Sequence, residues 1–166
     1  MDHHPLAEFF SEAVETALRS EGAATDPAVS HYLTELLVRF LHTDKIFAIQ
    51  DASGRTVVSV TEMVAQGDVR LAADSFERER QVHRHIGDFL LFWSGVYPEF
   101  LNRMRVAVGT DLLCDYERQG RESYHVVSTF DYPPFDAEAP VYRKLSEGFT
   151  TYAHSLRTVR SKLGHA

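Results

Sequence analysis

Hydrophobic residues recur every three or four positions along most of the chain, and this spacing predicts a largely α-helical protein. The first two predicted helices carry their apolar stripes over residues 6–18 and 29–41. Gly22 is a natural end for the first helix, and Asp26-Pro27 is typical of an N-cap followed by the first helical position. The short connection between the two helices favours antiparallel packing.

The longest predicted helix covers residues 75–96, near the middle of the chain. Its second half, from Phe89 onward, is apolar on every side, so it should be buried all round. A short helix over residues 98–105 follows, and Thr110 or Asp111 is the expected N-cap of the next long helix.

The C-terminal part of the chain combines one loop with one long helix. Residues 130–136 contain two adjacent prolines among aromatic residues and cannot be helical throughout, so they should form a loop. Residues 142–163 keep an alternating three-and-four spacing of apolar positions that suits bundle packing.

Residues 44–74 follow the helical pattern least clearly. Two apolar runs flank Asp51-Ala52-Ser53-Gly54, and they could pair as a small β-hairpin near residues 45–60. Ser59 and Glu62 instead resemble a capping box that opens a short helix ending near Gly67. Together these patterns predict one domain over residues 1–166, an all-α, up-and-down bundle of about five or six helices that includes a small hairpin if the apolar runs pair.

Charge is distributed unevenly between the two ends of the chain. The net charge is −7, and residues 1–35 hold seven acidic residues against the single base Arg19. Beyond Thr150 the chain is basic and has no acidic residue. We therefore expect the first and last helices to lie near one another, within one chain or across a homodimer.

Composition narrows the classes of function. The acidic balance disfavours binding to the phosphate backbone of nucleic acids. A single cysteine excludes a disulfide framework within one chain and fits a reducing compartment. The N-terminus does not resemble a signal peptide and no apolar stretch reaches membrane-spanning length, so we expect a cytoplasmic protein without membrane contact.

Part of the central helix resembles a known family. The stretch Ser75–Val82, continuing into His85–Phe89 and then Gly95–Glu99, is similar to a family of small uncharacterised bacterial helical proteins. The resemblance covers most of the chain from Asp44 onward. It implies a helical fold and no specific activity.

Four side chains are the candidates for a metal site: His85, Asp88, Glu122 and His125. Glu-x-x-His pairs on facing helices build the carboxylate–histidine sites of di-iron bundles, so iron or manganese is the metal that this set would hold. That pattern needs two Glu-x-x-His pairs and further glutamates, and the chain has only this one pair. The alternative is that His85 is a core histidine and that Asp88 pairs with it or with Arg84.

Two functions of different class remain open from the sequence. The favoured one is a non-catalytic interaction or regulatory module, for which a homodimer is one arrangement, because no catalytic motif accompanies the helical pattern. The other is a metal- or haem-dependent bundle enzyme or sensor, since aromatic residues 89–100 could line a ligand pocket beside His85. The same aromatic residues could equally be core.

Overall fold

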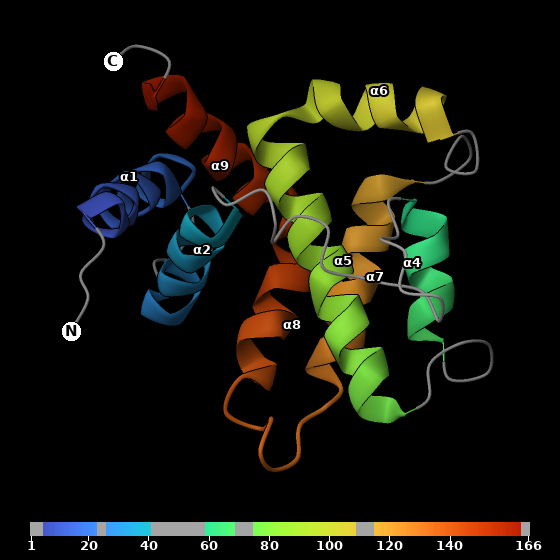
Figure 1. Cartoon of the computed structure of the whole chain (residues 1–166). Coiled ribbons are helices and arrows are strands. Elements are labelled where there is room, and N and C mark those ends of the chain that lie inside the picture. Colours follow the sequence, from blue (N-terminus) through green and yellow to red (C-terminus); the bar gives the residue numbers. More distant parts are fainter. Residues whose placement is uncertain (1–4, 23–25, 41–58, 69–74, 109–114, 164–166) are drawn as a thin grey trace.

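The computed structural model describes residues 5–22, 26–40, 59–68, 75–108 and 115–163, and every regular element among them is an α-helix (Figure 1). The all-α prediction is therefore confirmed for this part of the chain. The described residues hold eight helices, more than the five or six expected. Their bounds are α1 Pro5–Ser20, α2 Pro27–Phe40, α4 Val60–Gly67, α5 Phe76–Val96, α6 Pro98–Val108, α7 Tyr116–Ser128, α8 Ala139–Glu147 and α9 Phe149–Leu163.

Local capping explains where several helices begin. The Asp26 carboxylate accepts a hydrogen bond from the Ala28 amide at 2.9 Å, before α2. Ser59 caps α4 through the Glu62 amide, and Ser75 caps α5 in the same manner. Each cap satisfies one of the amides that the first turn of a helix leaves without a partner. The predicted starts of these three helices are thus confirmed.

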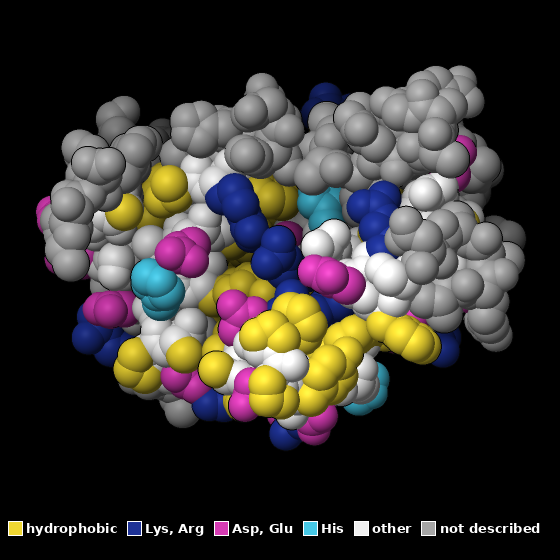
Figure 2. Space-filling view, turned by 60° about the horizontal axis from the view of Figure 1, so that its bottom comes forward, with side chains coloured by type: hydrophobic (Ala, Val, Ile, Leu, Met, Phe, Trp, Pro, Cys, Tyr) yellow, Lys and Arg dark blue, Asp and Glu magenta, His cyan; other side chains and the backbone are white. Residues whose placement is uncertain are grey.

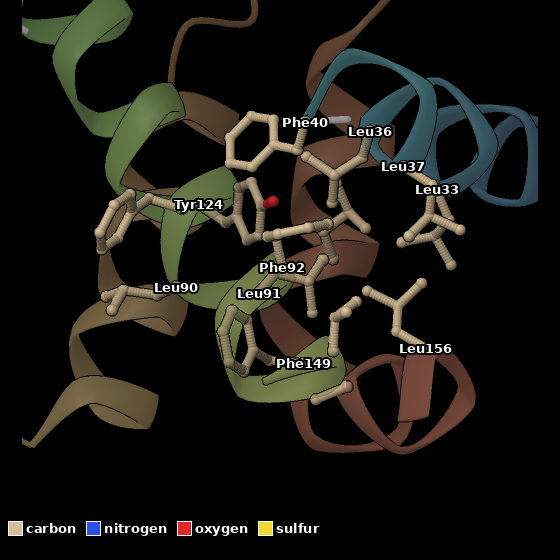
Figure 3. Close-up of a cluster of buried hydrophobic side chains, with 14 of the residues drawn as sticks. Leu33, Leu36, Leu37, Phe40, Leu90, Leu91, Phe92, Tyr124, Phe149 and Leu156 are labelled. Carbon is tan, nitrogen blue, oxygen red and sulfur yellow. The ribbon is translucent and has the colours of Figure 1, made fainter. Parts of the chain in front are cut away.

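Helix α5 forms the centre of the molecule and contacts α2, α4, α6, α7 and α9. Most of its second half is buried, as its apolar sequence predicts: Phe89, Leu90 and Leu91 have no exposed surface, whereas Trp93 and Ser94 are only partly buried. Leucine and phenylalanine side chains of α2 and α9 pack onto this helix (Figure 3). Burial of one such side chain contributes roughly 1.5–3 kcal/mol, so packing around α5 makes a large contribution to the stability of the fold.

Two glycines allow α7 to approach its neighbours closely. A Cβ atom on Gly87 of α5 would lie 2.6 Å from the Tyr124 ring of α7. A Cβ atom on Gly120 of α7 would lie 2.5 Å from the Phe149 ring of α9. Neither distance is compatible with a larger residue unless the ring moves. The aromatic rings of α7 and α9 therefore fill the space that the two glycines leave open.

The first and last helices pack against each other, as the sequence predicts. Both helices contribute apolar side chains to the core. Val14 and Ala17 of α1 are buried, and so are Leu156 and Val159 of α9. Of the basic residues near the end of α9, Arg160 pairs with Glu99 of α6 rather than with α1. The predicted proximity of the first and last helices is confirmed. The opposite charges that suggested it do not account for it here, because Arg160 pairs with α6 and not with α1.

Three expectations differ from the structure or fall outside it. The predicted helix over residues 142–163 is two helices, because α8 ends at Glu147 with Gly148 as its C-cap, and α9 starts at Phe149. Helix α7 begins at Tyr116 and is capped by Asp115, whose carboxylate accepts from the Arg118 amide, rather than by Thr110 or Asp111. The proposed hairpin near residues 45–60 lies almost wholly outside the described residues.

Candidate functional site

The four residues proposed for a metal site lie in three different surroundings. Asp88 is buried at the centre of the molecule, with 2% of its surface exposed. His85 is half-buried between the rings of Phe40 and Phe89. Glu122 and His125 are exposed on α7, and Glu122 pairs with Arg118 of its own helix at 3.0 Å.

Helix geometry explains why these four do not come together. Tyr124 is the α7 residue that faces Asp88, whereas Glu122, two positions earlier, lies on another side of α7, at a pocket lined by His83. Across the described residues, all four included, no three His, Cys, Asp or Glu side chains are grouped so that they could hold a metal ion. The structure thus does not assemble the iron or manganese site that the spacing suggested.

Asp88 is instead the hub of a hydrogen-bonded cluster that joins three helices. Its Oδ1 atom accepts from the hydroxyl of Tyr32 on α2 at 2.6 Å and from the hydroxyl of Tyr124 on α7 at 2.8 Å. Its Oδ2 atom accepts from Nη2 of Arg39 on α2 at 2.8 Å. A buried carboxylate needs such donors, because an unpaired one is costly. The predicted partners, His85 and Arg84, are not the ones that bond to it.

The electrostatics of this cluster keep the phenols protonated. Burial, and then the charge of Asp88, raise the pKa of Tyr32 and of Tyr124 well above the ordinary value. For Arg39, burial is the largest influence and lowers the pKa of the guanidinium, but Asp88, Tyr32 and Tyr124 together outweigh burial and the net shift is upward. The tyrosines remain donors and the arginine remains a cation over the whole physiological pH range.

The sequence contains an indication of the tyrosine partners of Asp88, although the three-residue spacing of His85 and Asp88 does not reveal it. Tyr32 and Tyr124 both occupy the apolar stripes of their predicted helices. A buried phenol usually finds an acceptor for its hydroxyl. Asp88, the carboxylate immediately before the predicted buried half of the central helix, is a natural acceptor, although only the fold shows that the three residues meet.

Arg84 lies one turn before Asp88 on α5 and adds a second cation near the cluster. Its side chain is half-buried and makes no hydrogen bond or ion pair with any described residue. The pKa of Arg84 is raised: burial lowers it, Tyr142, Asp88 and Tyr32 raise it, and the charge of Arg39 opposes them. Its position one turn before Asp88 on the same helix brings Arg84 near the carboxylate to which Arg39 is paired.

A separate pocket of about 320 Å³ lies between α4, α5 and α7. His83 lines it, and its Nδ1 atom lies 3.1 Å from the hydroxyl of the buried Ser123. Burial lowers the pKa of His83, and the charge of Asp68 only partly offsets this. Burial and the charge of Asp68 raise the pKa of Glu79 in the same pocket. The lining is thus acidic around a histidine that resists protonation.

The loop between α7 and α8 lies at one end of the molecule (Figure 1) and carries a group of aromatic rings. Phe130, Tyr132 and Phe135 contact one another with centroid separations of 5.9–6.3 Å. Arg80 of α5 holds the loop in place, because its guanidinium lies 4.1 Å from the centroid of the Phe135 ring and pairs with Glu138 at 2.7 Å. Arg80 itself is buried.

Apolar side chains are exposed where this loop meets the start of α5. Phe76, one turn before Arg80, is 66% exposed, and Tyr132 is 49% exposed. Figure 2 shows hydrophobic side chains gathered in a band at the front of this face. We call the following residues the aromatic loop surface: Phe76, Tyr132, Pro133, Pro134 and Phe135.

None of the helices that the structure describes is long and apolar enough to span a membrane. Comparison with known protein families, with characterised proteins and with solved structures finds no match for this chain. Inferences about function therefore depend on the geometry of the described residues.

Proposed function

We propose that this protein is a non-catalytic interaction module that binds a segment of a partner protein through the aromatic loop surface. The observation that carries the proposal is an exposed group of rings that the fold holds in one arrangement. Exposed aromatic side chains are costly in water and are enriched at interfaces, where tyrosine is a frequent source of binding energy.

The rigidity of the surface supports this function. The buried Arg80 contacts the Phe135 ring and pairs with Glu138. The backbone amide of Phe135 donates to the carbonyl of Tyr132 at 2.8 Å. Proline restricts the backbone between these two residues. A surface ordered before binding loses less conformational entropy when a partner docks, so more of the contact energy appears as affinity.

Charge around the surface indicates the chemistry of the partner. Asp131 and Asp136 flank the exposed rings and form no ion pair with any other residue that the structure places. A partner segment that combines apolar side chains with lysine or arginine would complement both the rings and the carboxylates. We therefore propose a basic, apolar peptide segment as the occupant.

The same charges favour a different protein over a second copy of this chain. In a symmetric dimer, each patch meets its own counterpart. Asp131 and Asp136 of one copy would then approach the same residues of the other, and like charges oppose such contact. We propose that the interaction takes place in the cytoplasm, since the single cysteine of the chain fits a reducing compartment.

Peptide selection provides the test. Random peptides displayed on phage are selected on the wild-type protein, with counter-selection on the double variant Phe76→Ser/Tyr132→Ser. The proposal predicts enriched peptides that carry net positive charge next to apolar residues. No enrichment over the double variant, or enrichment of acidic peptides, would contradict it.

A further inference from the structure

The cluster around Asp88 contains more positive than negative charge. Arg39 is paired with the single buried carboxylate of Asp88, and Arg84 lies one turn before that carboxylate on the same helix. Asp88 is bonded to Arg39, and both of its oxygens are already occupied by Arg39 and the two tyrosine hydroxyls. One cation is therefore left without a counter-charge among the residues that the structure describes.

Unused hydrogen-bond donors accompany this excess charge. Arg84 is half-buried, and its guanidinium makes no hydrogen bond or ion pair within the described part of the chain. The Nε atom of Arg39 is also buried, and it too has no acceptor there. A partly buried cation with unsatisfied donors is unfavourable unless an anion compensates it.

The surface at this place is open to a ligand. The side chain of Arg39 is 36% exposed, although its partner Asp88 is almost completely covered. On the face shown in Figure 2, Lys and Arg side chains gather in a hollow, with acidic and hydrophobic side chains around it. An anion could thus approach the guanidinium groups from solvent while Asp88 stays shielded beneath them.

From this arrangement we propose that Arg39 and Arg84 form a binding site for an oxyanion, the phosphate or carboxylate group of a small ligand. The planar guanidinium fork matches both groups and binds them with two parallel hydrogen bonds. Asp88 holds Arg39 at a fixed position, and Arg84 supplies the uncompensated charge. The residues differ from those of the aromatic loop surface, so the two proposals can fail independently.

Titration calorimetry tests the site directly. Inorganic phosphate and acetate are each titrated into wild-type protein at constant ionic strength in chloride, and then into Arg84→Gln. We expect saturable one-to-one binding of at least one of these anions, with affinity at least about tenfold lower in the variant, equivalent to about 1.4 kcal/mol. Tighter binding of phosphate would identify a phosphorylated ligand, and tighter binding of acetate a carboxylate.

The matched control is Arg19→Gln, at an exposed arginine of α1 whose side chain forms no hydrogen bond or ion pair with the described residues. This control should bind as the wild type does. Failure of both anions to bind, or equal affinity in wild type and Arg84→Gln, would overturn the proposal.

Thermal unfolding gives a second readout that does not depend on the anion chosen for calorimetry. Without phosphate, Arg84→Gln should unfold close to the wild-type temperature, because no hydrogen bond or ion pair is lost and the attraction of Asp88 for Arg84 is partly opposed by repulsion from Arg39. Added phosphate should raise the unfolding temperature of the wild type more than that of the variant. A marked loss of stability in anion-free Arg84→Gln would show that Arg84 serves the fold instead, and would also overturn the proposal.

Discussion

At the scale of single residues, Asp88 has the largest influence on the fold that we can identify. It is a buried carboxylate on the central helix, and its donors come from α2 and α7. Removing one member of a buried ion pair usually lowers the stability of a protein strongly, because the remaining charge is left buried without its counter-charge. Replacing the whole pair by apolar residues usually changes the stability less. The residue therefore acts as a point of connection between helices rather than as a metal ligand in the described structure.

Asp88→Asn should destabilise the protein by about 2–4 kcal/mol, because Arg39 loses its counter-charge and the amide group meets hydroxyl donors. Urea unfolding followed by the fluorescence of Trp93, the single tryptophan, measures the change. The control is Glu122→Gln, which removes an exposed ion pair and should cost less than about 0.5 kcal/mol. Equal stabilities of the two variants would show that the cluster does not hold the helices together.

His83 should make stability depend on pH. The pKa of His83 is lowered in the folded protein, chiefly by burial. Its contribution to stability is therefore complete at a pH above its pKa in the unfolded chain, about 6.5, and is lost as the pH falls through its lower pKa in the folded protein. Asp68, Glu79 and Glu122 line the same pocket, and the raised pKa of Glu79 acts in the opposite sense.

The difference between wild type and His83→Gln isolates this effect. Thermal unfolding between about pH 7 and 5 should show a shallower loss of stability in the variant than in the wild type. His154→Gln, which removes an exposed imidazole of α9, should leave the wild-type slope intact. A wild-type slope in His83→Gln would contradict the assignment.

At the scale of elements, the loop between α7 and α8 depends on one side chain from another helix. Arg80 joins the loop to α5 through the Phe135 ring and the Glu138 carboxylate. The loop has few backbone hydrogen bonds of its own, and the amides of Phe135 and Glu138 are among those that have an acceptor. Segments with few buried contacts open more readily than helices.

Arg80→Met should therefore loosen the loop, because methionine keeps part of the apolar stem but loses the ring contact and the ion pair. Amide hydrogen exchange at Phe135 and Glu138 should become faster, while exchange within α7 stays close to the wild type. Glu138→Gln removes the ion pair alone and should cause a smaller increase. Unchanged exchange in Arg80→Met would mean that the loop is ordered without this arginine.

The elements also show which features the sequence could predict. The caps at Asp26, Ser59 and Ser75 followed from sequence because each cap bonds to an amide two or three residues away. The break at Gly148 did not, since the apolar spacing continues from α8 into α9 across it.

The candidate site was harder to predict than the helices. Tyr32 lies 56 positions from Asp88, and Arg39 lies 49 positions from it, so only the packing of α2 against α5 brings them together. The pattern of Glu122 and His125 resembled a metal motif because spacing along one helix says nothing about which side faces the neighbouring helix. Tyr124 takes the inward position instead.

At the scale of the whole molecule, the central helix connects the two proposed functional regions. Helix α5 carries Phe76 and Arg80 near its start, and Arg84 and Asp88 follow at intervals of one turn. One helix thus contributes Phe76 to the aromatic loop surface, Arg80 to the contacts that hold the loop, and Arg84 to the proposed oxyanion site. Its buried second half fixes all of these positions relative to the core.

The affinity of a single peptide tests the proposed interaction most directly. A peptide selected on the wild type is titrated, by fluorescence anisotropy, into wild type, Phe76→Ser/Tyr132→Ser and the control Val106→Ser, which alters an exposed apolar residue of α6. The account predicts a dissociation constant at least about tenfold larger for the double variant, corresponding to about 1.4 kcal/mol, and an unchanged one for the control. Equal affinity for all three proteins would show that the aromatic loop surface does not bind the peptide and would contradict the proposed function.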